Sequence, residues 1–263
     1  MNDSYYWWGL EESTFKGVLY DSINTYFLHD HPYNNWKEFS EADPHMAYAH
    51  LTYIRFEALE QQFIDLRVIP QMLGVQDLPI KSIVKDINRY EWLKSIVDLT
   101  LFRFSSLRDI CFHFVNEVLE LKIKDHELNI KKLKSRLRDS HPNVLMNLKV
   151  LDSSGLPLRE DRNERAHKGF CKLYTEDDDF FKTAAWMEKP GQVMEGYDLI
   201  SVFNSARDKI SSIVINEVET ALKSCISLVN ELYDYYRDHH DFLSKNSRSG
   251  VSGHFHDYHR KKK

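Results

Sequence analysis

The chain has 263 residues, of which 42% are hydrophobic and 29% are charged, and its net charge is −5. This composition is that of an ordinary globular protein and excludes a disordered or fibrous one. The negative charge argues against a general DNA or RNA coat protein, although it leaves open an enzyme that holds RNA locally. Only nine glycines and seven prolines are present, which disfavours an all-β protein and favours long helices.

The cysteines and the start of the chain indicate a cytoplasmic protein. Cys111, Cys171 and Cys225 lie far apart and form no CxxC pair, so we expect a reducing compartment and no disulfide framework. The first residues lack the basic and apolar regions of a signal peptide. No window of about twenty residues is free of charge, so we expect no membrane-spanning helix.

The first eighty residues predict a helical layer of their own. Asp43 and Pro44 predict a helix start, with proline at the first helical position. Apolar residues then recur at spacings of three and four, and we expect this helix to stop near Pro70. The start of the chain is crowded with aromatic side chains, which indicate a core or a subunit interface more than a ligand site: Tyr5, Tyr6, Trp7, Trp8, Phe15, Tyr20, Tyr26 and Phe27.

The rest of the chain predicts a bundle of long helices. Apolar residues follow a helical period almost without interruption from Lys81 to Ile123, which is longer than most globular helices. Ser153 to Pro157 has the composition of a loop. Further helices are expected over residues 127–137, from His141-Pro142 to 151, over 179–187, and over 199–242.

These elements predict an all-α protein, an up-and-down bundle with long antiparallel helices and an added N-terminal layer. We expect three parts: an aromatic-rich helical extension over residues 1–80, the bundle over 81–242, and a tail over 243–263. The composition of the tail predicts a disordered basic terminus, and a solvated tail is favoured over one that grasps RNA.

Residues 159–169 do not fit a helix that packs on the core. Between Leu158 and Phe170, Ala166 has the only apolar side chain, so hydrophobic packing does not dictate this sequence. Two interpretations remain, a solvated charged loop and a functional site.

Within this segment, Arg162, Asn163 and His167 resemble the R-N-x-x-x-H form of the motif of HEPN domains, small helical bundles that act mainly as RNases. The looser spacing of arginine and histidine carries little weight because it occurs elsewhere in the chain, at Arg108–His113, Arg136–His141 and Arg248–His254. Only Arg162 is followed by asparagine. The resemblance covers roughly residues 81–242 and leaves the first eighty residues unmatched.

The resemblance implies a metal-independent endoribonuclease without a cofactor, which cleaves RNA as a homodimer with Arg162 and His167 from each chain. A toxin or phage-defence effector is the implied setting, with an antitoxin or inhibitor protein as a further partner. Histidine suits proton transfer and arginine suits a phosphate. Because residues five apart on a regular helix point about 140° from each other, we predict an irregular backbone between Arg162 and His167.

A supporting polar face is expected on the long helix before the motif. Asp109 and Asn116 are seven residues apart and share a helix face, with Arg108 beside them. In HEPN domains such groups are aimed at the Arg/His site. An interpretation of equal weight is that Asp109 and Asn116 cap or bridge helices inside the bundle.

Other kinds of site are disfavoured. Asp177, Asp178 and Asp179 could bind a divalent cation, but adjacent carboxylates more often start a helix. His239-His240-Asp241 lacks the spacing of a zinc site, and no glycine-rich phosphate loop occurs. We therefore predict neither a metal nor a cofactor. Two rivals to the RNase remain: a dimeric nucleotide- or RNA-binding adaptor without catalysis, and a purely structural bundle.

Overall fold

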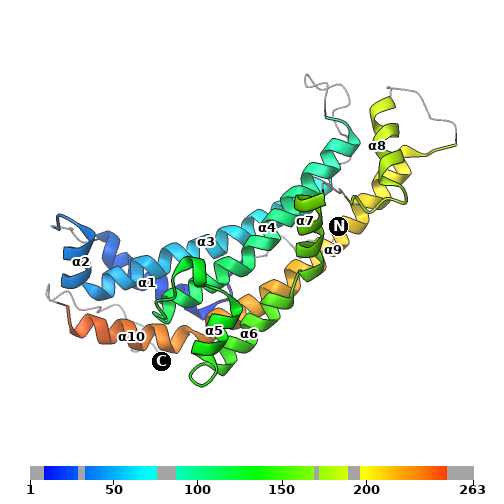
Figure 1. The fold of residues 1–263 in the computed structure, drawn as a ribbon. Helices are drawn as coiled ribbons and strands as arrows, with labels where there is room; N and C mark the ends of the chain where they lie inside the picture. The colour runs from blue at the N-terminus through cyan, green and yellow to red at the C-terminus, as the bar shows by residue number, and fades with distance from the viewer. Residues whose placement is uncertain (1–8, 29–32, 76–86, 169–171, 189–195, 248–263) are drawn as a thin grey trace. The chain divides into compact units, whose positions relative to one another are not determined.

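The computed structural model describes residues 9–28, 33–75, 87–168, 172–188 and 196–247 (Figure 1). These residues contain helices and no strand, which confirms the predicted all-α class. None of the helices in this part of the chain combines the length and apolar character that a membrane span requires. The α-helices are α1 (Thr14–Leu28), α2 (Trp36–Ala42), α3 (Pro44–Leu73), α4 (Arg89–Val118), α5 (Ile130–Leu137), α6 (Pro142–Ser153), α7 (Leu156–Lys168), α8 (Asp178–Met187), α9 (Leu199–Glu231) and α10 (Tyr233–Lys245).

The described residues fall into two compact units. Those within 62–107 and 153–221 form the first unit, and those within 9–61, 108–152 and 222–247 form the second. The long helices α3, α4 and α9 each contribute residues to both units. The division of the chain at residues 80 and 242 stays a prediction.

The core of the second unit is built around Phe15 of α1, which is fully buried. Its ring centroid lies 5.8 Å from that of Phe56, 5.4 Å from Phe114 and 5.1 Å from Tyr236. Burying an aromatic side chain of this size stabilises the fold by about 1.5–3 kcal/mol. Phe15 thus joins α1 to α3, α4 and α10, whereas the aromatic residues 5–8 lie outside the described part.

Helix α3 begins at Pro44 as predicted, and the carbonyl oxygen of Asp43 accepts the first helical hydrogen bond, from Ala47. The helix passes Pro70 and ends three residues beyond it, at Leu73, so the predicted stop near Pro70 is slightly early. Proline removes only one bond of the helical ladder. Leu73, beyond the proline, is buried in the core at 2% exposure, which offsets that loss.

Helix α4 carries the predicted apolar face but is shorter than predicted, because within the described residues it starts at Arg89 and ends at Val118 instead of Ile123. The predicted start at Lys81 lies outside the described residues. Glu120 and Lys122 adopt positive φ angles of 44° and 55°, which a continuing helix does not allow. The Asn116 amide both donates to the carbonyl oxygen of Ile123 and accepts from its N–H, each at 3.1 Å. This side chain closes the turn that ends α4.

The predicted last helix, residues 199–242, is present as two helices separated at Leu232, α9 and α10. Cys225 of α9 is fully buried, and its Sγ lies 4.0 Å from that of Cys111 in α4. Both thiols are free, and burial raises the pKa of Cys225. Cys171 lies outside the described residues.

Candidate functional site on helix α7

Helix α7 starts from a two-residue turn, Ser154-Gly155, so the predicted loop over residues 153–157 is wrong at both ends. Pro157 lies in the first turn of α7, where the N–H it lacks would have had no helical partner. Gly155 has a φ of 63°, and its N–H donates to the Glu217 carboxylate of α9 at 2.9 Å. The Phe104 ring of α4 occupies the space that a Cβ at position 155 would need.

The residues of the predicted motif lie within one regular helix. Helix α7 runs without interruption from Leu156 to Lys168, so the predicted irregular backbone between Arg162 and His167 is wrong. The segment is rich in arginine and glutamate and contains an alanine, all of which favour helix formation. His167 is the second-to-last residue of this helix.

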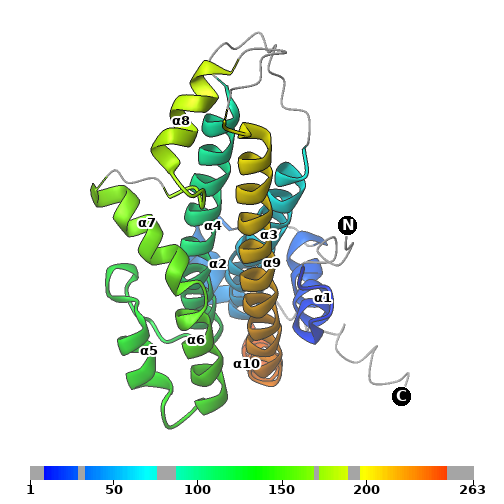
Figure 2. The ribbon, with the colours of Figure 1, turned by 90° about the vertical axis from the view of Figure 1, so that its right-hand side faces the viewer.

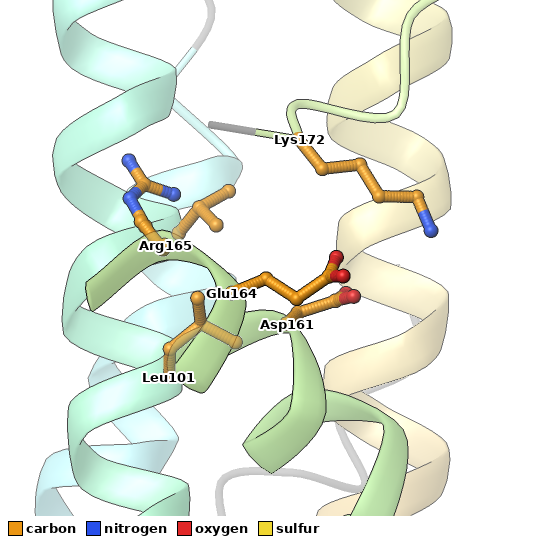
Figure 3. A pocket seen from close by; sticks show the side chains of 6 residues that line it. Leu101, Asp161, Glu164, Arg165 and Lys172 are labelled. Atoms are coloured by element: carbon orange, nitrogen blue, oxygen red, sulfur yellow. The ribbon is translucent and has the colours of Figure 1, made fainter. Parts of the chain in front are cut away.

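Polar contacts, in place of a hydrophobic face, hold much of α7 in position. Arg159 is buried at 8% exposure, and its Nη1 donates to the carbonyl oxygen of Ser154 at 2.9 Å. The Arg165 Nε lies 2.5 Å from Oδ1 of Asp98 on α4, and the Arg165 side chain is only 13% exposed. In Figure 3 the Arg165 side chain is directed toward α4. Arginines thus hold the segment in place, and the pattern of apolar residues gives no sign of these contacts.

Arg162, Asn163 and His167 of α7 are all exposed to solvent, although Arg162 and His167 leave the helix axis in different directions. The Arg162 Nη1 donates to the Asn163 Oδ1 at 2.9 Å. Asn163 lies four residues before His167, and side chains at this spacing are neighbours on a helix surface. Asn163 therefore draws the guanidinium around the helix toward the face that carries His167.

A cavity of about 320 Å³ lies behind α7 in the first unit (Figure 3). None of the three motif residues lines it. Asp161 accepts a hydrogen bond from the Tyr174 hydroxyl at 2.8 Å, and burial, followed by this bond, raises the pKa of Tyr174. The cavity offers an RNA phosphate no uniformly cationic surface, because carboxylates line it together with cations. The residues that line it are Val97, Leu101, Asp161, Glu164, Arg165 and Lys172.

The expected supporting residues belong to the second unit. Arg108 contacts Asp109 at 2.9 Å and Asp152 at 3.5 Å. Asn116 closes the turn after its own helix, α4. A role of Arg108, Asp109 or Asn116 in a catalytic site stays a prediction.

The aspartates at residues 177–179 start a helix. Asp177 caps α8 by accepting from the Phe180 N–H at 2.9 Å. Asp178 accepts from the N–H groups of Leu173 at 2.8 Å and Thr175 at 3.2 Å. Within the described residues, no cluster of three or more His, Cys, Asp or Glu side chains could hold a metal ion.

One charged surface was not predicted from the sequence. Helix α5 exposes a run of lysines and arginines between residues 131 and 138, which the sequence displays as KKLKSRLR. The pattern of this stretch predicted only a helix over residues 127–137, and the observed helix starts at Ile130.

Comparison with known proteins adds the family. Residues 81–235 match the Cthe2314-like HEPN family, and this stretch is more than half of the chain. No curated protein and no solved structure matches the chain significantly. The matched stretch contains α4 to α9, and therefore the motif helix α7. The chain belongs to the Cthe2314-like HEPN family.

Proposed function

We propose that the chain is a metal-independent endoribonuclease that acts as a homodimer. HEPN domains are often RNases, and the observation that carries the proposal is the exposed group on α7. There the Arg162 guanidinium donates to the Asn163 Oδ1 at 2.9 Å, and Asn163 lies one helical turn before the exposed His167. Arginine, asparagine and histidine are together in a segment whose sequence hydrophobic packing does not explain.

These residue types match the needs of RNA cleavage without a metal. The ribose 2′ oxygen attacks the adjacent phosphorus, the bond from phosphorus to the 5′ oxygen breaks, and a 2′,3′-cyclic phosphate and a 5′-hydroxyl form. His167 would move a proton, either from the 2′-hydroxyl or to the leaving oxygen. Arg162 would donate hydrogen bonds to the charged phosphorane, and Asn163 would keep Arg162 in place.

The reaction needs a base and an acid, and one chain contributes only one histidine to this group. The outer face of α7 is exposed, so a second copy could bring its own Arg162 and His167 to the same phosphate. On a regular helix these two side chains leave the axis about 140° apart. A groove between two facing α7 helices would be a natural place for both to reach one strand of RNA.

The regular helix also favours a second candidate, a dimeric HEPN adaptor that binds RNA or a nucleotide without cleaving it. An arginine and a histidine on an exposed helix can hold a phosphate without meeting the stricter geometry of proton transfer. The two candidates differ in one measurable outcome, which is whether the RNA is cut.

The test is incubation of purified protein with RNA in EDTA, followed by analysis of the RNA ends. Arg162→Ala and His167→Ala are each expected to lower the cleavage rate by about 10²-fold or more. Glu160→Ala changes an exposed side chain of the same helix outside the motif and should leave the rate unchanged. Asn163→Ala should have an intermediate effect, since it removes the hydrogen bond that holds Arg162.

Cleavage to 2′,3′-cyclic ends that both motif variants abolish would support the enzyme. RNA binding without cleavage would favour the adaptor, and absence of both would exclude the two together. Sedimentation of the purified chain tests the dimer. A toxin or phage-defence effector should arrest growth when expressed, and His167→Ala should relieve the arrest; a protein that binds and silences the active form would be its antitoxin or inhibitor.

A further inference from the structure

The segment of the chain that follows α4 and precedes α6 carries a concentrated basic surface. Residues 122–138 contain seven lysines or arginines and two acidic residues, a net charge of +5 in a chain whose total is −5. All seven cationic side chains are exposed: Lys122, Lys124, Lys131, Lys132, Lys134, Arg136 and Arg138. The remainder of the chain is therefore acidic on balance, although the tail over residues 243–263 is also basic.

Helix α5 is firmly anchored beneath these charges. The Asn129 side chain caps the helix by accepting from the N–H groups of Lys131 at 3.0 Å and Lys132 at 3.1 Å. Leu133 and Leu137 lie one turn apart, and both are fully buried. Figure 2 shows α5 beside α6, in the same unit. The cations project from a preformed support, which lowers the entropy lost when they bind a ligand.

Three of the cations form one flank of α5. Lys131, Lys134 and Arg138 follow the spacing i, i+3 and i+7, so they lie above one another on the helix surface. No acidic side chain of the described residues forms an ion pair with any of the three. Lys132, on the other flank, is paired with Glu127 at 3.3 Å. The flank therefore keeps its positive charge available for an external anion.

The chemistry of this flank favours a phosphate backbone over a lipid surface. Peripheral membrane helices combine lysines with exposed apolar side chains that enter the lipid. The two leucines of α5 are instead buried in the protein. Lysine and arginine side chains in a row suit the repeated phosphates of a nucleic acid, whose binding releases counterions.

We propose that the Lys131/Lys134/Arg138 flank of α5 binds the phosphate backbone of the RNA on which the chain acts. The choice of RNA rests on the proposed function, whereas the preference for a polyanion rests on the charges of α5 themselves. The flank recruits RNA without reading its sequence, because contacts to phosphates carry no base information. Such a flank would allow a protein of net negative charge to bind RNA.

The experiment measures the binding of a short, labelled single-stranded RNA to His167→Ala protein, which keeps the RNA intact. Fluorescence anisotropy is recorded between about 50 and 200 mM salt. Replacing Lys131, Lys134 and Arg138 together by glutamine should weaken binding at low salt. It should also reduce the slope of log K against log salt by about 2, from 0.7 for each lost phosphate contact on a single strand.

The control variant carries Lys37→Gln, Lys223→Gln and Lys245→Gln, which remove the same charge from exposed positions elsewhere. It should bind RNA almost as the parent does. A second control exchanges lysine and arginine at the same positions (Lys131→Arg, Lys134→Arg, Arg138→Lys). This variant should retain RNA binding, because the charges are kept. Equal losses in the α5 and control variants would overturn the proposal, as would absence of RNA binding by the parent.

Cleavage by the otherwise unchanged chain separates this proposal from the RNase. If RNA is cut, the triple α5 variant should show a higher KM and an unchanged kcat. If the triple α5 variant cleaves RNA with unchanged KM and kcat, the proposal that the flank binds RNA is refuted, whereas the proposed RNase activity is supported. If the parent binds RNA in a salt-dependent way, the α5 variant loses this binding and neither protein cleaves RNA, the flank proposal is supported and the RNase activity is refuted. Loss of binding to vesicles of anionic lipid, with RNA binding unaffected, would assign the flank to a membrane and overturn the proposal.

Discussion

Replacing Gly155 by alanine should destabilise the protein at the junction from which α7 starts. The residue has a φ of 63°, and forcing an L side chain into this region costs about 1–2 kcal/mol. The added Cβ would also overlap the ring of Phe104. Phe104 is buried at 2% exposure, so the ring has little room to move, and overpacking of this kind costs about 1–3 kcal/mol.

The two effects together predict a loss of about 2–5 kcal/mol in the free energy of unfolding. For a chain of this size, the loss should lower the thermal midpoint by at least about 4 °C. The assay is urea unfolding followed by circular dichroism, with calorimetry for the midpoint. A weakened hydrogen bond from Gly155 to Glu217 would add to the loss and disturb the start of α7.

Two other glycines separate the contributions. Gly196 has a φ of 78° and open space around it, so Gly196→Ala should show the backbone strain alone, about 1–2 kcal/mol. Gly17 lies within α1 with no atom near its Cβ position, and Gly17→Ala should stabilise by about 0.5–1 kcal/mol. If Gly155→Ala were no more destabilising than Gly196→Ala, the reasoning about Phe104 would be refuted.

Two further predictions concern buried charge. Arg89→Ala should lower the free energy of unfolding by about 3 kcal/mol, because it deprives the largely buried Glu188 of a partner at 3.0 Å. The control is Lys37→Ala, which removes an exposed ion pair. An unchanged urea midpoint for Arg89→Ala, or an equal effect of Lys37→Ala, would contradict this. Burial lowers the pKa of His45 below 6.5, so the unfolded chain binds the proton more readily, and stability should fall below about pH 6.5 by up to roughly 1.4 kcal/mol per pH unit. His45→Phe should flatten the fall of the thermal midpoint in that range, whereas His126→Gln at an exposed site should not.

The sequence alone determined the class of the fold and most of its helices. Leu93, Leu101, Phe104, Cys111 and Phe114 follow a helical period in the sequence and are all buried in α4. Such patterns are local, because a helix satisfies its own backbone, and the spacing of apolar residues selects the buried face without reference to distant parts of the chain.

Ends of helices were predicted less well because they depend on distant contacts. Composition at residues 153–157 and at Pro70 indicated breaks, yet α7 starts at Leu156 and α3 passes Pro70. In both cases burial or a hydrogen bond elsewhere in the fold outweighs the local preference. Glu217, which holds the Gly155 N–H, is more than sixty residues away in the sequence.

In the candidate site, too, the sequence determined some features and the tertiary structure others. From the sequence, Arg162, Asn163 and His167 stand out because no apolar face accounts for their segment. They indicated a HEPN domain, and the chain belongs to a HEPN family. Only the tertiary structure decided how this helix is placed, because Arg165 reaches Asp98 on α4, a helix far away in the sequence. The same contacts turn the motif residues outward, and the burial of the α5 leucines likewise turns its cations to solvent. The sequence specifies the residue types of a helix, but the contacts made by one side of the helix determine which side faces solvent.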